Sequence, residues 1–176
     1  KDIVPTSMQT PVAIAYAKVD ENFQLQGYGP YDRPNYNPRV ALSAFWKDLN
    51  SSDCVVTFNG RTFDFPVLEL AAFEQGIPLA AWFSRVDKWS QPRNRYYEKT
   101  FDLYDIYGNF SAHHMAGGLN MMAKRIGCPG KMGTDGSQVW GMYKQGKIAE
   151  IADYCQCDVL DTYWVFVRYA VQLGKL

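Results

Sequence analysis

CVVTFNGRTFD, residues 54–64, contains the clearest change from strand to helix signals in the sequence. Its first five residues are mostly apolar or β-branched, which is typical of a strand, and Asn59-Gly60 is a turn signal. A helix is expected from Phe65 to Gln75, since Gly76 follows it as a C-terminal cap. Strand, turn and helix in this order indicate a chain of the α/β class.

Upstream of this stretch the sequence predicts a hairpin and a helix. Residues 11–19 are short, apolar and partly β-branched, which suits a strand, and residues 23–28 alternate in a way that suits its hairpin partner. Residues 29–38 are rich in Tyr, Pro and Asn and predict a loop. A helix is expected to begin at Pro38, because Asn37 offers a cap before a proline at the first helical position.

Downstream, the sequence predicts a loop, a third strand and further helices. Residues 82–99 have no clean period and predict a long loop, whereas residues 101–106 predict a strand. Residues 119–126 predict a short helix, and residues 130–136 a glycine-rich loop. Apolar residues recur at helical spacing over residues 147–173, as one long helix or two abutting ones. The expected architecture is a mixed central sheet flanked by helices.

The length, composition and net charge of the chain limit the class of protein to which it can belong. A chain of 176 residues with 47% hydrophobic residues, 20% charged residues and net charge +0 suits one folded domain over residues 1–176 and excludes a disordered chain. No apolar run spans a bilayer, and no secretion signal is visible, so no membrane partner is expected. The four cysteines match neither a zinc pattern nor a disulfide framework, which favours a reducing, cytoplasmic location.

Tyr154 and Asp158 are candidates for one site on the last predicted helix. Residues four apart lie on one face of a helix. A carboxylate can bind a hard divalent cation, and a neighbouring phenol can orient a water on that cation. The spacing alone is equally compatible with an exposed aspartate beside a half-buried tyrosine.

Asp64 is a second candidate, because it follows a strand end and opens a helix. The carboxyl ends of strands in α/β sheets are common ligand sites. Asn59 is expected in the turn, and Phe63 could anchor the turn in the core. The structural alternative is that Asp64 caps the helix. An aspartate at the N-cap position stabilises a helix by about 1 kcal/mol.

Basic and aromatic residues are interleaved without a regular period in the predicted loop at residues 82–99, among them Arg93, Arg95 and Tyr96. Basic side chains neutralise phosphates, and aromatic faces stack on bases without reading sequence, so this loop suits a single-stranded end. A solvated loop with aromatics anchored in the core is the alternative. Lys131, among glycines, could also approach phosphate, although a flexible connection explains the same residues.

Two stretches together resemble the motifs of a known nuclease superfamily. TFNGRTFDFPVL, residues 57–68, resembles the second exonuclease motif of the DEDD (DnaQ-like) 3'-5' exonucleases, and YCQCDVLDTY, residues 154–163, resembles the third. The stretch PGKMGTDGSQVW, residues 129–140, is similar to a segment of the predicted exonucleases related to the proofreading domain of B-family DNA polymerases. The resemblance covers the chain from about Pro11 onward.

This resemblance implies a ribonuclease H-like fold and a metal-dependent 3'-5' exonuclease, a hydrolase of phosphodiester bonds. In that family four carboxylates bind two Mg2+ or Mn2+ ions, and Asp64 and Asp158 match two of them. Tyr154 matches the tyrosine that positions the attacking water. Phe63 is expected at the substrate, the 3' end of single-stranded or frayed DNA or of RNA, and Asn59 is expected to support either the substrate or Asp64.

The first motif of the family, Asp-x-Glu on the first strand, is not present in these residues. We therefore expect that the chain begins inside the domain and that residues 1–176 alone have little activity, because two carboxylates hold two ions weakly. The alternative function is a catalytically silent ribonuclease H-like module that binds nucleic acid or a partner. The sequence leaves open the preference for DNA or RNA and the oligomeric state.

Overall fold

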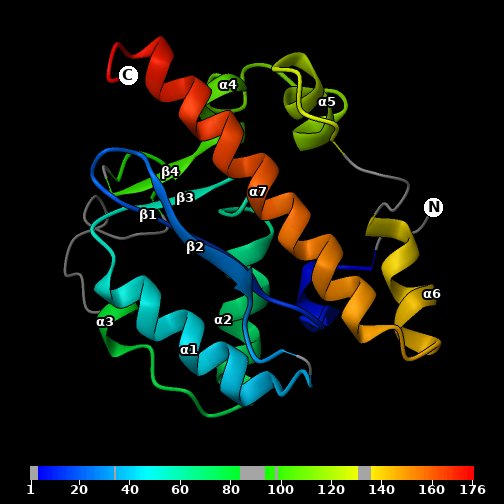
Figure 1. Ribbon diagram of the computed structural model, residues 1–176. Helices are drawn as coiled ribbons and strands as arrows, with labels where there is room; N and C mark the ends of the chain where they lie inside the picture. Colours follow the sequence, from blue (N-terminus) through cyan, green and yellow to red (C-terminus); the bar gives the residue numbers. More distant parts are fainter. Residues whose placement is uncertain (1–3, 34, 84–93, 98, 131–135) are drawn as a thin grey trace. The chain divides into compact units, whose positions relative to one another are not determined.

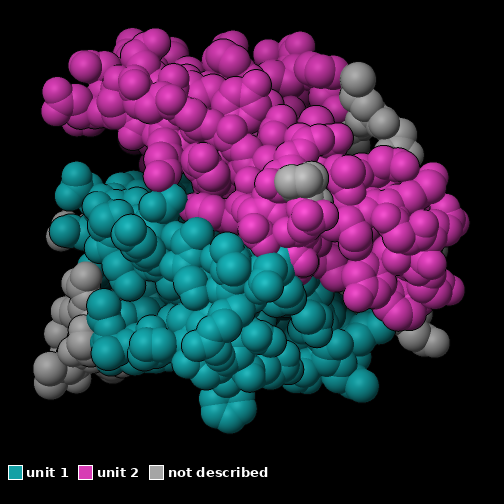
Figure 2. Space-filling view, turned by 60° about the horizontal axis from the view of Figure 1, so that its bottom comes forward, with its two compact units in different colours: residues 1–11, 37–114 teal, residues 12–36, 115–176 magenta. Residues whose placement is uncertain are grey.

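The computed structural model describes residues 4–33, 35–83, 94–97, 99–130 and 136–176. The chain divides into two compact units, coloured separately in Figure 2. Unit 1 consists of Lys1–Pro11 and Asn37–His114, and unit 2 of Val12–Tyr36 and Met115–Leu176. Each unit therefore combines two segments that are distant in the sequence.

Unit 1 is a small α/β unit (Figure 1). Its elements are η1 (Thr6–Met8), α1 (Pro38–Ser51), β3 (Val55–Thr57), α2 (Asp64–Glu74), α3 (Ala80–Phe83), β4 (Thr100–Asp102) and α4 (Leu103–Tyr107). The predicted start of α1 is confirmed, because the Asn37 side chain accepts a 3.2 Å hydrogen bond from the backbone N–H of Val40. The predicted helix after the NG turn is α2, and Gly76 follows its end with φ of 63°.

Aromatic side chains form the core of unit 1. The Trp82 ring lies 5.2 Å from that of Trp46 and 5.0 Å from that of Phe65, and Trp82 is only 3% exposed. Its indole N–H donates a 2.8 Å hydrogen bond to the buried carboxylate of Glu69. The prediction that the loop begins at Trp82 was therefore wrong, because this residue belongs to α3 and packs between α1 and α2.

Strands β3 and β4 pair in parallel, with Val55 opposite Thr100 and Thr57 opposite Asp102. The strand predicted at residues 101–106 is shorter, because the chain turns into α4 directly after Asp102. The Asp102 side chain accepts a 3.0 Å hydrogen bond from the backbone N–H of Tyr104 and so caps α4. Parallel pairing places the carboxyl ends of both strands at one edge of this small sheet.

Unit 2 combines a hairpin with the longest helix of the chain (Figure 1). Its elements are β1 (Ala15–Val19), β2 (Leu25–Pro30), α5 (Gly118–Arg125), η2 (Gly136–Gln138), α6 (Val139–Lys144) and α7 (Ile148–Gln172). Strands β1 and β2 are antiparallel, which confirms the predicted hairpin. Its turn is closed by Asp20, whose carboxylate accepts hydrogen bonds from the backbone N–H groups of Asn22 and Gln24, both at 2.9 Å.

Helix α7 is one continuous helix, which settles the alternative between one helix and two. It contacts β1, β2, α5 and α6, so it is the element around which unit 2 is packed. The Tyr163 hydroxyl donates a 2.9 Å hydrogen bond to the backbone carbonyl of Phe23, and Phe23 packs against Phe166 at 5.6 Å. These contacts attach the hairpin turn to the helix.

The α/β composition predicted from the sequence is confirmed. Within the described residues the strands form two pairs, β1–β2 and β3–β4, so a single ribonuclease H-like sheet stays a prediction. No helix in the described part of the chain combines the length and the hydrophobicity that a bilayer crossing requires.

Candidate functional site

The turn that follows β3 is held by a buried carboxylate. Asp102, which is 6% exposed, accepts hydrogen bonds from the backbone N–H of Asn59 at 2.7 Å and of Arg61 at 3.0 Å. Asn59 has a φ of 65°, a left-handed conformation that asparagine adopts more readily than most residues. Charge-assisted bonds to backbone N–H groups are strong, so Asp102 fixes the path of the chain leading to α2.

A second carboxylate, that of Asp105, fixes the Arg61 side chain in the same turn. Arg61 donates two hydrogen bonds to Asp105, at 2.6 Å from Nε and 2.8 Å from Nη2. Their side chains are 18% and 8% exposed, and the hydrogen bond to Asp105 raises the pKa of Arg61 above its ordinary value. Asp102 and Asp105 are thus occupied by hydrogen-bond donors, and sequence reasoning missed both roles.

The turn that follows β3 is held by Asp102, and we call it the Asp102 turn. It leaves Phe63 and Asp64 at the surface. Phe63 is 47% exposed, so the expectation that it anchors the turn in the core was wrong. Phe63 occupies the N-cap position of α2 and Asp64 is the first helical residue, so Asp64 is not the cap. A carboxylate in the first turn of a helix is favourable, because the N-terminal end of the helix is positive. The Asn59 side chain accepts a 2.5 Å hydrogen bond from the Thr62 hydroxyl.

The third-motif residues lie on α7 in unit 2. Tyr154 and Asp158 are both partly exposed and lie one helical turn apart, as the spacing predicted. The neighbouring Asp153 forms a 2.8 Å ion pair with Arg33 of the same unit, at the surface. Unit 2 therefore presents the phenol and the carboxylate on one face of one helix, whereas Asp64 belongs to unit 1.

Residues 94–97, which belong to the predicted basic and aromatic loop at residues 82–99, are attached to the chain after α4. Arg95 donates a 2.8 Å hydrogen bond from Nη1 to the backbone carbonyl of Phe110. The Tyr96 ring lies 5.4 Å from the Phe110 ring and remains 63% exposed. Tyr96 is thus attached at one side and accessible to solvent. Arg93 and Lys131 lie outside the described residues.

A metal site of three or more ligands is not present within the described residues. The donor chemistry of Asp64 and Asp158 nevertheless fits Mg2+ or Mn2+, which prefer carboxylate oxygens. Each of these carboxylates belongs to its own unit.

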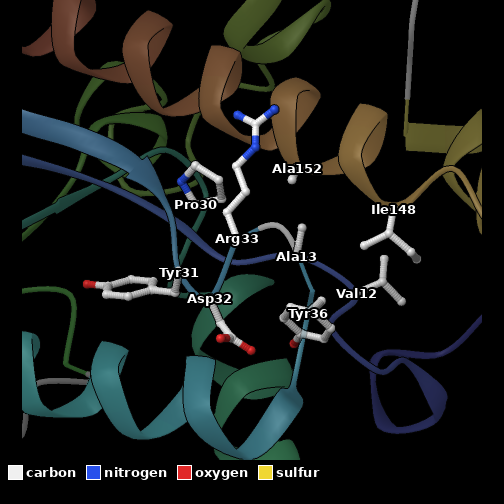
Figure 3. A pocket seen from close by; sticks show the side chains of 9 residues that line it. All are labelled: Val12, Ala13, Pro30, Tyr31, Asp32, Arg33, Tyr36, Ile148 and Ala152. Atoms are coloured by element: carbon white, nitrogen blue, oxygen red, sulfur yellow. The ribbon is translucent and has the colours of Figure 1, made fainter.

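A small hollow in unit 2 contains none of the candidate residues (Figure 3). Arg33 points toward α7, and Asp32 points the opposite way. The Tyr36 hydroxyl is buried and has no hydrogen-bond partner within the described residues. Burial, and to a smaller extent Cys155 and Asp32, raises the pKa of Tyr36. The lining residues are Val12, Ala13, Pro30, Tyr31, Asp32, Arg33, Tyr36, Ile148 and Ala152.

Comparison with known proteins identifies the family. The family model described as predicted 3'-5' exonuclease related to the exonuclease domain of PolB matches residues 1–176. No curated protein matched the chain. The matched residues include the Asp102 turn and the face of α7 that carries Tyr154 and Asp158. The chain belongs to this family of predicted 3'-5' exonucleases.

Proposed function

We propose that the protein is a metal-dependent exonuclease that hydrolyses phosphodiester bonds at the 3' end of single-stranded or frayed DNA. The observation that carries this proposal is the turn held by buried Asp102, which leaves Phe63 and Asp64 exposed after a strand end. The proposal includes one ribonuclease H-like domain over residues 1–176. It also includes a reducing, cytoplasmic location, which rests on the spacing of the four cysteines in the sequence.

In this proposal the chain positions the 3' end and the attacking water. Asp64 and Asp158 would hold two Mg2+ or Mn2+ ions, with water and phosphate oxygens completing the ligand shells. When bound, such ions lower the pKa of water and stabilise charge on the attacking and leaving oxygens. The Tyr154 phenol would orient the water by a hydrogen bond.

Other residues would bind the strand. Asn59 and the exposed Phe63 flank the Asp102 turn and suit the terminal nucleotide. Tyr96 offers a ring for stacking, and Arg95 a positive charge. Arg93 and Lys131 are proposed as further phosphate contacts, on the basis of the sequence.

The activity is tested with the full-length gene product and a 5'-labelled single-stranded oligonucleotide in Mn2+. Progressive shortening from the 3' end is expected, and EDTA should abolish it. Asp64→Asn and Asp158→Asn should each lower the rate by about 100-fold or more, since metal ions contribute several kcal/mol to catalysis. Asp153→Asn is the matched control on α7, because that carboxylate is engaged with Arg33.

The second candidate is a catalytically silent nucleic-acid-binding module. It is favoured by the absence of an Asp-x-Glu motif from residues 1–176. Binding of the oligonucleotide without metal-dependent shortening would support this candidate. Equal rates for the parent, Asp64→Asn and Asp158→Asn proteins would contradict the exonuclease proposal.

A further inference from the structure

Helix α6 exposes two stacked aromatic rings. Trp140 is 65% exposed and Tyr143 is 44% exposed, although tryptophan is usually among the more buried residues. Their ring centroids are 5.9 Å apart and the rings are nearly parallel, at 19°. The Lys144 ammonium lies 5.5 Å from the centroid of the Trp140 ring. We call Trp140, Tyr143 and Lys144 the α6 aromatic face.

Helical spacing accounts for this arrangement. Residues three and four positions after Trp140 lie on the same side of a helix, so Tyr143 and Lys144 both reach its ring. Val139 and Met142 are less exposed, and α6 contacts α7. The apolar residues of α6 therefore serve packing, while its aromatic face remains exposed.

The charged side chain of the α6 aromatic face itself is basic. Between Gly136 and Ala149 the only charged residues are Lys144 and Lys147. Lys147 lies 3.5 Å from Glu150, in an exposed ion pair. Lys144 is exposed and its ammonium lies near an aromatic ring, so its charge is accessible to an anion.

We propose that the α6 aromatic face is a stacking site for a base of single-stranded nucleic acid. A base would stack on the exposed Trp140 ring, which Tyr143 keeps in place, and Lys144 would neutralise the adjacent phosphate. Flat aromatic surface combined with positive charge matches single-stranded nucleic acid better than a peptide, which has no repeated anionic charge. The inference rests on the proposed function only in its choice of nucleic acid as ligand.

The α6 aromatic face lies in the same unit as Tyr154 and Asp158, which suggests how it would contribute to substrate binding. Helix α7, which α6 contacts, also carries Tyr154 and Asp158. Asp158 lies about 15 Å along α7 from its start, at 1.5 Å per residue. The α6 aromatic face would therefore hold the strand away from the reacting bond.

Binding is measured separately from cleavage, by fluorescence anisotropy of a labelled oligo(dT) of about 12 nucleotides, a length within known site sizes. The full-length gene product is used in EDTA. Trp140→Ala should raise the Kd about five-fold or more, and Trp140→Phe should retain most of the affinity. Trp164→Ala is the matched control, because Trp164 is 48% exposed on α7 and lies outside the α6 aromatic face.

Two further measurements separate stacking from a general loss of structure. On an abasic strand of the same length, the parent and Trp140→Ala proteins should bind equally, because the phosphates remain and the bases are gone. Lys144→Gln should lower the slope of log Kd against log salt concentration by about 0.7, the value for one phosphate on a single strand. A far-ultraviolet circular dichroism spectrum checks that each variant is folded.

The outcomes decide the inference independently of catalysis. Unchanged affinity of folded Trp140→Ala, an equal loss in Trp164→Ala, or an equal loss on the abasic strand would each overturn the stacking site. If the protein shortens DNA but Trp140→Ala binds normally, the proposed function stands and the stacking site fails. If the protein binds through Trp140 but never shortens DNA, the stacking site stands and the exonuclease proposal fails.

Discussion

The carboxylate of Asp102 accepts a 2.7 Å hydrogen bond from the backbone N–H of Asn59, which lies 43 residues earlier in the chain. The same carboxylate accepts bonds from the N–H groups of Arg61 and Tyr104, both at 3.0 Å. One buried side chain thus joins the turn after β3 to the start of α4. The turn before Asp64 owes its shape to this long-range contact.

Asp102→Asn should lower the free energy of unfolding by about 2 kcal/mol, because the amide offers one acceptor oxygen where the carboxylate offers two. Urea unfolding measures the loss. Asp20→Asn is the control, since the Asp20 carboxylate accepts similar bonds in an exposed turn, and its loss should be below about 1 kcal/mol. Equal stability of Asp102→Asn and the parent would contradict the role of Asp102.

The Arg61–Asp105 pair should show strong coupling in a double-mutant cycle with alanine. Each single substitution should cost about 3 kcal/mol, since it leaves a largely buried charge without its partner, and the double variant should lose less than the sum. The exposed Arg33–Asp153 pair is the comparison and should couple by less than about 1 kcal/mol. Additive losses at Arg61 and Asp105 would show that the pair does not act as a unit.

Gly60→Ala should distort the Asp102 turn. A Cβ at Gly60 would lie 2.5 Å from the Cβ of Thr57, which is too close for any two such atoms, so the backbone must shift. We expect lower stability, by about 1–3 kcal/mol, and a lower rate of 3' nucleotide release. Gly27→Ala serves as control, because its added Cβ meets no atom within 4 Å. Full activity of Gly60→Ala would argue against the turn as part of the site.

Tyr154→Phe tests the assignment of the phenol. Loss of the hydroxyl should lower the rate of 3' release on the order of 100-fold, because a misplaced water reacts slowly. The affinity for the oligonucleotide in EDTA should stay within about two-fold, since the ring remains. Tyr28→Phe, on the 48% exposed Tyr28 of unit 2, is the matched control. A fully active Tyr154→Phe enzyme would exclude a water-positioning role.

Local signals in the sequence were enough to predict several helices and strands. The cap at Asn37, the hairpin of β1 and β2, the strand before Asn59 and the helix that carries Tyr154 and Asp158 all follow from periodicity, capping and turn residues. These signals act between residues a few positions apart, so they can be read without knowing the fold. The family motifs were visible for the same reason, because each is one continuous stretch.

Long-range packing, by contrast, sets which side chains support those elements. That Trp82 fills the core of unit 1, that Asp102 binds the Asn59 turn and that Asp105 binds Arg61 depends on the pairing of β3 with β4 and on packing around it. Parallel strands are joined by long connections, and no local period records which carboxylate will end beside which N–H group. Burial strengthens these hydrogen bonds. Asp102 and Asp105, which no sequence motif singles out, therefore control the shape of the candidate site.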